Sequence, residues 1–371
     1  MATYAHITGW GMAVPKKILT NDDLSKMVDT NDEWIRDRTG IEQRHIAGPQ
    51  DTTASLGAEA AINALRVARL HPTEIDLIIV ATSSPEYLFP ATACVIQDQI
   101  GAVNAGAFDL LAACTGFIYA LNMASLAIKG GTAKNALVIG AETLSRLVDW
   151  TDRGTCILFG DGAGAFVVQA SDVHGGIFSS VMRSDGSGGS SLIIPGGGSK
   201  NPASHQSIQD GLHFVKMNGR EVYRFATRVM AQASFEAIKK ANLKVADIRL
   251  IIPHQANKRI IEAAARGLKL PMERFMVNVN KYGNTSTASI PIATCEAFES
   301  GRLQRGDDIV FVGFGAGLTW GSMAAQWTGP LQEREGRLWL RRYKKLTRIR
   351  SFFRRLRRRI EGLIWGHNRT A

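Results

Sequence analysis

Short apolar runs alternate with longer amphipathic stretches along most of this 371-residue chain. The apolar runs, rich in Val, Ile and Leu, span residues 75–83, 105–113, 135–142, 165–171, 248–254 and 307–315. Runs of this kind are typical of strands whose sheet is covered on both faces. The stretches with helical periodicity span residues 53–70, 115–131 and 219–243. This alternation predicts an α/β fold in which helices pack on mainly parallel sheets.

Two segments, at 73–86 and 246–258, echo each other. Each contains the pattern Ile-x-Leu-Ile-Ile before a polar turn, starting at Ile75 and at Ile248, which are 173 residues apart. A strand-and-turn unit repeated at this separation hints at two similar halves. Residues 184–211 are rich in Gly and Ser, so we expect a surface excursion there rather than a linker between domains.

The excess positive charge of the chain is confined to its tail. The formal net charge is +11, and residues 331–371 alone hold 14 Lys or Arg against 3 Asp or Glu. The body before residue 331 is therefore balanced in charge, and no nucleic-acid binding is expected. The sequence shows neither an uninterrupted apolar stretch of membrane-spanning length nor a secretory signal. We expect a cytoplasmic protein.

The cysteines are Cys94, Cys114, Cys156 and Cys295, and they lie far apart in the sequence. They form no Cys-x-x-Cys pair and no histidine cluster accompanies them, so neither a zinc site nor a disulfide framework is predicted. No metal and no cofactor is expected, and any chemistry at cysteine would use a reduced thiol.

Cys114 lies where the apolar run 105–113 gives way to a helical stretch. At the first turn of a helix, free N–H groups and the positive end of the helix dipole favour the thiolate, which is the nucleophilic form of cysteine. A single intracellular cysteine is nevertheless more often an inert, buried core residue. The position of Cys114 leaves both interpretations open.

Two polar residues of the second half stand at comparable junctions. His254 ends an apolar strand, and Asn284 lies in a glycine-containing loop before another helical stretch. Taken singly, a histidine at a strand end is usually a structural residue and an asparagine in such a loop is usually a turn residue. His254 and Asn284 indicate a catalytic site only in combination with Cys114.

Six motifs in a fixed order resemble those of a known family. They read DEWIRDRTGIEQRHIA, FDLLAACTGF, DRGTCILFGDGAGA, HQANKRI, YGNTSTASIP and GFGAGLTWGS. Over roughly residues 4–327 the chain closely resembles the 3-oxoacyl-acyl-carrier-protein synthase III family of the thiolase superfamily. The resemblance implies a thiolase-like five-layered αβαβα fold of two halves, 1–172 with the cysteine and 173–330 with the histidine and asparagine. The basic tail, 331–371, follows them.

The resemblance also implies the reaction, in which an acyl-CoA primer condenses with malonyl-acyl carrier protein and begins fatty acid synthesis. Cys114 would take up the acyl group, and His254 and Asn284 would donate hydrogen bonds to the enolate left when the malonyl group loses carbon dioxide. The backbone N–H groups of Cys114 and Ala316 would form the oxyanion hole. Ala316 departs from the glycine common in the family, because alanine keeps the N–H but loses freedom at positive φ.

Further residues match family positions that bind substrates and shape the acyl pocket. Those implied to bind coenzyme A are Trp34, Arg38, Arg153 and Asn257. Those implied to dock the acidic acyl carrier protein are Arg224, Arg259 and Arg266. The family is generally homodimeric, and Phe89 matches a position that lines the acyl pocket of the partner subunit. A phenyl ring there favours a short primer such as acetyl.

The tail departs from the family, whose chains usually end soon after the WGS motif. Its apolar residues recur every three or four positions among arginines, at Trp339, Tyr343, Leu346, Ile349, Phe353, Leu356, Ile360 and Leu363. This spacing predicts a basic amphipathic helix. Such a helix over 337–365 suits an anionic surface at the inner face of the membrane. Packing on the body, an acidic protein partner and a polyanion remain alternatives.

Other functions of the same fold stay open at this point. Specialised condensing or acyl-transfer enzymes of secondary metabolism or long-chain ketone synthesis share the Cys, His and Asn set. Degradative thiolases use a second reactive cysteine, and Cys156 and Cys295 lie in different sequence contexts. Outside enzymes the alternative is a scaffold with a membrane-binding tail, which the retention of all three reactive residues disfavours.

Overall fold

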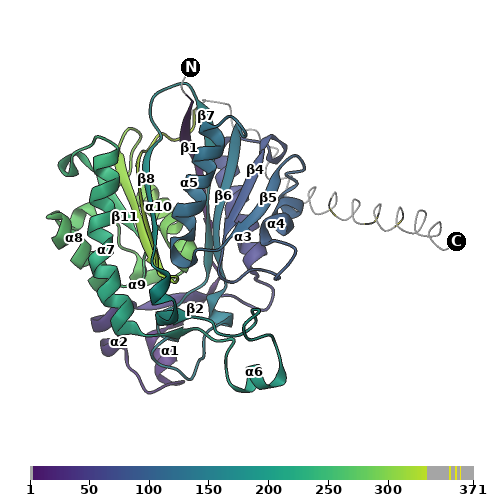
Figure 1. Cartoon of the computed structure of the whole chain (residues 1–371), viewed down its shortest axis with the longest axis vertical. Coiled ribbons are helices and arrows are strands. Elements are labelled where there is room, and N and C mark those ends of the chain that lie inside the picture. Colours follow the sequence, from purple (N-terminus) through teal and green to yellow (C-terminus); the bar gives the residue numbers. More distant parts are fainter. Residues whose placement is uncertain (1–2, 332–350, 352–355, 357–359, 361–371) are drawn as a thin grey trace.

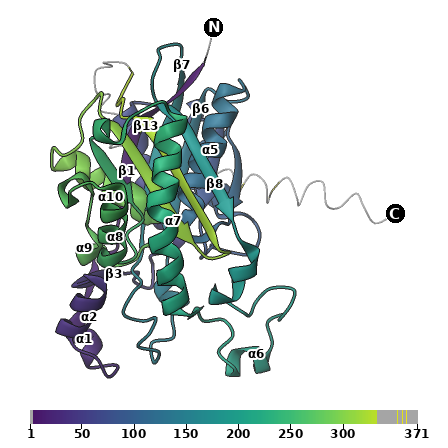
Figure 2. The ribbon, with the colours of Figure 1, turned by 60° about the vertical axis from the view of Figure 1, so that its left-hand side comes forward.

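The computed structural model describes residues 3–331 together with Ser351, Leu356 and Ile360. Its body consists of five alternating layers of helices and sheets (Figure 1). The helices of the three helical layers are, from one side to the other, α3 (Thr53–Ala68) and α4 (Thr92–Ile100), α5 (Gly116–Lys129) and α10 (Ser289–Glu299), and α7 (Gly219–Lys240) and α8 (Lys258–Leu268). Figure 2 shows α7 lying across the outer face of the second sheet. The predicted five-layered αβαβα fold is confirmed.

The two large sheets are mixed. The first has the order β1-β7-β6-β4-β5, formed by Tyr4–Ala13, Gly162–Ser171, Asn135–Glu142, Leu77–Ala81 and Gly106–Leu110. The second has the order β11-β12-β13-β8, formed by Leu250–Pro253, Asp308–Gly315, Thr319–Gln326 and Ile177–Ser184. All six apolar runs are strands, as predicted. The expectation of mainly parallel sheets is wrong, because β1, β7, β8 and β13 all pair antiparallel.

The two halves repeat the same order of elements, so the predicted duplication is confirmed. Seven elements of the first half have counterparts in the second, in the same order along the chain. The first half contributes β1, α3, β4, α4, α5, β6 and β7, and their counterparts are β8, α7, β11, α8, α10, β12 and β13. β5 has only a remnant in the second half, where a single parallel bridge joins Ile251 of β11 to Phe275. The predicted boundary between 172 and 173 falls in the connection from β7 to β8 and stays a prediction.

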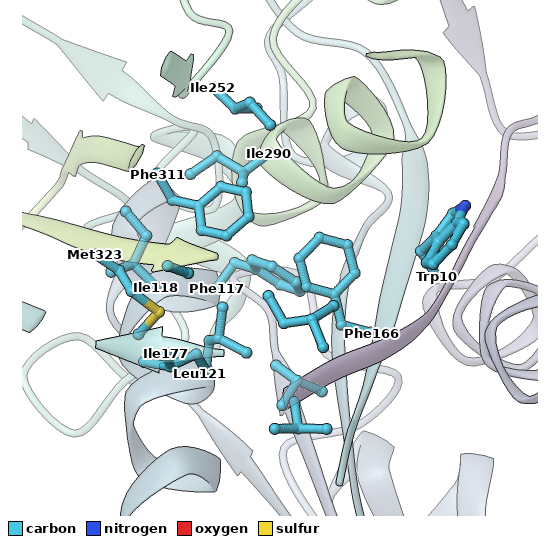
Figure 3. Close-up of a cluster of buried hydrophobic side chains, with 14 of the residues drawn as sticks. Trp10, Phe117, Ile118, Leu121, Phe166, Ile177, Ile252, Ile290, Phe311 and Met323 are labelled. Carbon is cyan, nitrogen blue, oxygen red and sulfur yellow. The ribbon is translucent and has the colours of Figure 1, made fainter. Parts of the chain in front are cut away.

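One buried cluster joins the halves through the middle helical layer (Figure 3). Phe117 and Phe166 come from the first half, Ile290 and Phe311 come from the second, and none of them is more than 1% exposed. Because burial of apolar surface is the main favourable contribution to folding, each half stabilises the other.

Smaller elements lie at the lower end of the body in Figure 1. They are the antiparallel pair β2 (Lys17–Thr20) and β3 (Gln43–Ile46), with α1 (Asn21–Ser25), α2 (Asp32–Thr39) and α9 (Val279–Tyr282). The Gly- and Ser-rich segment forms a surface excursion, as predicted, and α6 projects from the body (Figure 2). Its elements are β9 (Leu192–Ile193) and α6 (His205–Gln209), and β9 pairs with β10 (Lys216–Met217).

Only a few residues of the tail are described. Leu356 and Ile360 are helical and exposed, at 40% and 48%, and the other members of the predicted apolar stripe lie outside the described residues. Ser351 is buried, and its hydroxyl donates to the carboxylate of Asp98 on α4. Within the described part of the chain, no helix has the length and apolar character needed to cross a membrane.

Candidate active site

Cys114 lies in the turn between β5 and α5. β5 ends at Leu110, a 3₁₀ turn covers Ala113–Thr115, and α5 begins at Gly116. Cys114 is 7% exposed. Ala113 before it has a φ of +45°, in the left-handed region that residues other than glycine rarely adopt. The structure therefore places Cys114 at the predicted strand-to-helix junction, on a strained stretch of backbone.

The Cys114 thiol is less acidic than the sequence suggested. Burial raises its pKa to about 12, a hydrogen bond with the Ser286 side chain lowers it, and the charge of Glu142 raises it again. Loss of solvation thus opposes the thiolate that the helix end was expected to favour. Burial therefore favours the protonated thiol of Cys114.

His254 follows β11 directly, and its backbone N–H donates to the carbonyl of Val312 on β12 at 2.8 Å. Its Nδ1 lies 2.7 Å from the hydroxyl of Ser289, the first residue of α10. Its Nε2 is buried and has no hydrogen-bond partner within the described chain. Burial lowers the pKa of His254 to about 3. The ring is therefore neutral, with one nitrogen fixed by a hydroxyl and the other available to a ligand.

Asn284 precedes the 3₁₀ turn Ser286–Ala288, which leads into α10. Its backbone is fixed on both sides, because its N–H donates to Leu158 at 2.8 Å and its carbonyl accepts from Gly160 at 3.0 Å. Its side-chain Oδ1 accepts from the N–H of Ser286 at 2.8 Å. The amide oxygen is thus occupied, and among the described residues the amide NH₂ has no acceptor. The NH₂ group is left to donate to a ligand.

The end of β12 lies against both Cys114 and His254. A Cβ at Gly315 would lie 2.8 Å from the backbone nitrogen of Cys114. A Cβ at Gly313, two residues earlier on the strand, would lie 3.5 Å from the Cβ of His254. Successive side chains of a strand alternate between faces, so these two positions share one face. Cys114 and His254 therefore approach β12 from the same side.

Ser286 links the thiol to the Asn284 amide. Its side chain hydrogen-bonds the Cys114 thiol, and its backbone N–H holds the Asn284 side chain. Its φ of +47° lies in the left-handed region, which costs about 1 kcal/mol for a residue other than glycine. The three predicted reactive residues, from distant parts of the chain, thus surround one buried site.

Comparisons with known proteins agree with this geometry. The profiles of 3-Oxoacyl-[acyl-carrier-protein (ACP)] synthase III and of its C terminal match residues 108–186 and 238–327. Beta-ketoacyl-[acyl-carrier-protein] synthase III of Roseiflexus sp. (strain RS-1) is 50% identical over 328 residues, which is 88% of this chain and 100% of that protein. The protein of the same name from Desulfitobacterium hafniense (strain DSM 10664 / DCB-2) is 51% identical over 322 residues, which is 87% of this chain and 97% of that one. The chain belongs to the 3-oxoacyl-[acyl-carrier-protein] synthase III family.

A solved structure shows the same fold. The crystal structure of 3-oxoacyl-[acyl-carrier-protein] synthase III from Aquifex aeolicus VF5 has a TM-score of 0.81 with this chain. The two are 48% identical, and the match covers 87% of this chain and 99% of that one. The resemblance predicted from the six motifs is confirmed.

Ala316 replaces the family's glycine without strain. The residues other than glycine that have a positive φ in the described chain are Arg69, Ala113, Asn242, Lys269 and Ser286. Ala316 is not one of them, whereas Gly317 after it has a φ of +137°. The freedom of glycine is needed one residue later, so alanine fits and keeps its N–H. The oxyanion hole of Cys114 and Ala316 stays a prediction.

Three of the residues predicted to bind coenzyme A lie together at α2. The guanidinium carbons of Arg38 and Arg153 lie 4.7 and 5.1 Å from the centre of the Trp34 ring. Arg153 also donates to the backbone carbonyl of Asp29 at 2.8 Å, which fixes its place. An indole with two arginines over it suits the flat base and the phosphates of a nucleotide.

Asn257, also predicted to bind coenzyme A, caps α8. Its Oδ1 accepts from the N–H of Arg259 at 2.8 Å, and its Nδ2 donates to the carbonyl of Arg38 at 2.9 Å. Asn257 therefore fixes α8 against α2. The predicted docking residues Arg224 on α7 and Arg259 and Arg266 on α8 are exposed, and these two helices pack together. Their part in docking stays a prediction.

Phe89 lies on the loop between β4 and α4 and is 86% exposed. Its neighbours Tyr87 and Leu88 are 57% and 85% exposed. Exposed apolar residues that gather in this way are typical of surfaces that bind another protein, a membrane or a ligand. This exposure agrees with the prediction that Phe89 reaches a partner subunit, which itself stays a prediction.

An open groove of about 680 Å³ lies away from Cys114. Its lining residues are Arg36, Gly40, Glu42, Lys258, Met272, Glu273, Phe275, Val277, Asn280 and Arg302. None of them is a predicted site residue, and Arg36 is paired with Glu42 at 3.2 Å. The groove is not a candidate for the reaction.

Three polar residues of the site were missed by the sequence analysis, namely Glu142, Ser286 and Ser289. Glu142 could have been noticed as the single charged residue of the apolar run 135–142, which it ends. The signal for the two serines is the density of hydroxyl residues in the motif that carries Asn284.

Proposed function

We propose that this chain moves an acyl group from acyl-CoA to Cys114 and condenses it with malonyl-acyl carrier protein. The products are carbon dioxide and a 3-oxoacyl-acyl carrier protein, and the reaction begins fatty acid synthesis. The observation that carries the proposal is the convergence of Cys114, His254 and Asn284 on one buried site. The chain is also 50% and 51% identical to two proteins named for this activity.

In the first step the Cys114 sulfur attacks the thioester carbonyl of acyl-CoA. The bond from that carbonyl to the CoA sulfur breaks, and the proton that Cys114 loses balances the one that the CoA thiolate takes up. Because burial holds the pKa of Cys114 near 12, this proton leaves as the sulfur attacks. The N–H groups of Cys114 and Ala316 stabilise the oxyanion, and each such donor is typically worth about 3 to 4 kcal/mol.

In the second step the malonyl group loses carbon dioxide, and the electron pair of the broken C–C bond becomes an enolate. Nε2–H of His254 and the NH₂ of Asn284 donate to the enolate oxygen. We assign the proton to Nε2 because the Ser289 hydroxyl can donate to Nδ1. The enolate carbon attacks acyl-Cys114, the acyl C–S bond breaks, and the Cys114 thiolate takes up a proton from solvent, so that the overall reaction consumes one proton.

The alternative of a specialised enzyme of secondary metabolism or long-chain ketone synthesis is not favoured. Relatives at 50% and 51% identity over at least 87% of the chain carry the name beta-ketoacyl-[acyl-carrier-protein] synthase III. The proposed steps use side chains and backbone groups of this chain alone, without a metal or a cofactor.

The substrates approach from the α2 side. We assign the nucleotide of coenzyme A to Trp34, Arg38 and Arg153, since their stacking already provides an aromatic and positively charged surface. The exposed arginines Arg224 and Arg259 suit an acidic carrier protein.

Mass spectrometry of the intact full-length protein after incubation with a panel of acyl-CoAs tests the proposal. The expected result is one added acyl group, which the variant Cys114→Ala lacks. Cys156→Ala is the matched control, since Cys156 is also buried, and it keeps the acyl group. Acetyl-CoA is expected to react faster than long-chain primers. An unmodified parent protein, or a preference for long chains, contradicts the proposal.

We further propose that the active form is a homodimer. The exposed apolar residues Tyr87, Leu88 and Phe89 support it, because a monomer would leave them in water. Sedimentation equilibrium is expected to give twice the mass of the chain. A monomer at the concentrations used for assays would contradict this expectation.

We also propose that the protein is cytoplasmic and that its tail binds an anionic membrane surface. Leu356 and Ile360 are both helical and exposed and are four positions apart, whereas Ser351 is buried and bonded to Asp98 of α4. These two apolar side chains are therefore available to a partner. The charge of +11 in residues 331–371 supports an anionic partner.

Vesicles that contain phosphatidylglycerol test this attachment. Full-length protein is expected to sediment with them more than a chain truncated after Pro330, and added salt is expected to weaken the difference. Equally poor binding of the two chains contradicts the proposal.

A further inference from the structure

Glu142 is the last residue of β6 and is 0% exposed. Its carboxylate accepts from the N–H of Ser83 at 3.1 Å, from the hydroxyl of Ser84 at 2.6 Å and from the hydroxyl of Thr287 at 3.0 Å. Within the described chain it forms no ion pair. Burying a carboxylate costs free energy that an apolar residue at the same place would not cost. Stability alone therefore does not explain why a carboxylate is buried at position 142.

The hydroxyl groups around Glu142 are arranged as donors. Ser84 Oγ already accepts from the N–H of Thr143 at 2.9 Å, so its hydrogen is directed to Glu142. Thr82 Oγ1 likewise accepts from the N–H of Ser84 at 3.1 Å and donates to Glu142 at 3.4 Å. Both oxygens of Glu142 only accept, which suits an ionised carboxylate. Burial raises the pKa of Glu142, and the bonds from Ser84 and Ser83 counter the rise.

Two partners of Glu142 come from the second half, namely Thr287 and its neighbour Ser286. A Cβ at Gly140 would lie 2.3 Å from the carbonyl oxygen of Thr287, and a Cβ at Gly116 would lie 3.3 Å from its methyl group. Thr287 is therefore wedged between β6 and the start of α5, and Glu142 binds its hydroxyl. The bond fixes the segment that carries Asn284 to β6, and the contact at Gly116 places that segment beside the start of α5, next to the nucleophile.

We propose that Glu142 is a positioning residue, which binds Thr287 across the seam between the halves and thereby sets the distance from the Asn284 amide to the site. Glu142 touches neither a substrate nor the reacting atoms. The inference rests on the proposed function, because it concerns the enolate-forming step. Acylation needs Cys114 and its oxyanion donors, whereas decarboxylation needs Asn284. Loss of Glu142 therefore slows decarboxylation more than acylation.

Two substitutions on opposite sides of the contact test the proposal. Glu142→Gln keeps the shape but turns an NH₂ group toward groups that are themselves donors. Thr287→Val keeps the shape of Thr287 and removes only its hydroxyl, and Thr287→Ser restores the hydroxyl. Each full-length variant is assayed for acylation by acetyl-CoA, followed by intact mass, and for release of carbon dioxide from malonyl-CoA.

We expect decarboxylation to fall about 100-fold in Glu142→Gln, the usual result of displacing a catalytic group by about 1 Å. In Thr287→Val it falls about 10-fold, the result of losing one hydrogen bond. Acylation falls much less in both variants, because Glu142→Gln removes a charge that raises the pKa of Cys114 and Thr287→Val keeps that charge. Thr287→Ser behaves as the parent. A residue that only stabilised the fold would not produce this split between the two half-reactions.

Asp109→Asn is the matched control. The carboxylate of Asp109 on β5 accepts from the N–H groups of Thr92 and Ala93 at 2.7 and 2.8 Å, at the start of α4. The same acid-to-amide change there is expected to lower the melting temperature and leave both half-reactions unchanged.

Equal losses in both half-reactions, or no loss in either, would overturn the inference. If Glu142→Gln does not fold, the pair Thr287→Val and Thr287→Ser decides alone. A parent protein that is neither acylated nor active on malonyl-CoA refutes the proposed function instead, so the two failures are distinguishable.

Discussion

The substitution Ser289→Ala tests how far the reaction depends on the orientation of His254. The two side chains are 2% and 1% exposed, with 2.7 Å between Oγ and Nδ1. Without the hydroxyl, Nδ1 joins Nε2 in having no partner within the described chain. A buried polar group without a partner costs about 1 to 3 kcal/mol. If that energy is lost from the enolate transition state, the rate of decarboxylation falls about 5- to 150-fold.

Release of carbon dioxide from malonyl-CoA measures this loss, and thermal unfolding shows whether the variant is folded. Ser234→Ala is the control, because Ser234 is also buried in a helix and its hydroxyl donates to the carbonyl of Met230 at 2.9 Å, which is not a residue of the site. Acylation of Cys114 is expected to persist in both variants. A Ser289→Ala protein that decarboxylates as fast as Ser234→Ala would refute the role given to this hydrogen bond.

Further predictions concern pH and the glycines of the site. The pKa of His254 is lowered from 6.5 to about 3, so the stability that its neutral form contributes is complete above pH 6.5 and is lost as the pH falls toward 3. The decarboxylation rate is therefore expected to show no inflection near pH 6.5, and an inflection there that Ser289→Ala moves would contradict a neutral ring. Gly315→Ala puts a Cβ 2.8 Å from the nitrogen of Cys114 and is expected to cost about 1 to 3 kcal/mol of stability and to slow acylation. Gly186→Ala, with nothing within 4 Å of its Cβ, is the neutral control, and equal melting temperatures would contradict the clash. Ala316→Gly is expected to change neither rate, since Ala316 needs no positive φ, and a clear gain in acylation would show that alanine strains the oxyanion hole.

The strands that are buried on both faces could be predicted from the sequence. The runs 135–142 and 307–315 correspond to β6 and β12, at 135–142 and 308–315. β1 was missed because Gly9 and Gly11 interrupt its apolar pattern. A Cβ at either glycine would lie 2.4 Å from a backbone atom of Ala64 on α3. These two positions are glycine because α3 approaches β1 closely there, and the sequence around β1 does not show that approach.

The reactive residues could be named from the family motifs, but their surroundings could not. The helix-end position of Cys114 is visible in the sequence, whereas the burial that raises its pKa to about 12 depends on packing by other segments. Glu142 and Thr287 are ordinary residue types 145 positions apart, and only the fold brings their oxygens to 3.0 Å. A hydrogen bond between distant residues leaves no local pattern.

The interior drawn in Figure 3 restricts how this molecule can move. Buried side chains of both halves form one continuous cluster there, and protein interiors are close-packed, so the halves are not expected to swing apart or close on a substrate as hinged lobes do. The distance between Cys114 and His254 is then expected to change no more than the packed interior does. Any motion that admits or releases a substrate belongs to the surface loops around the site.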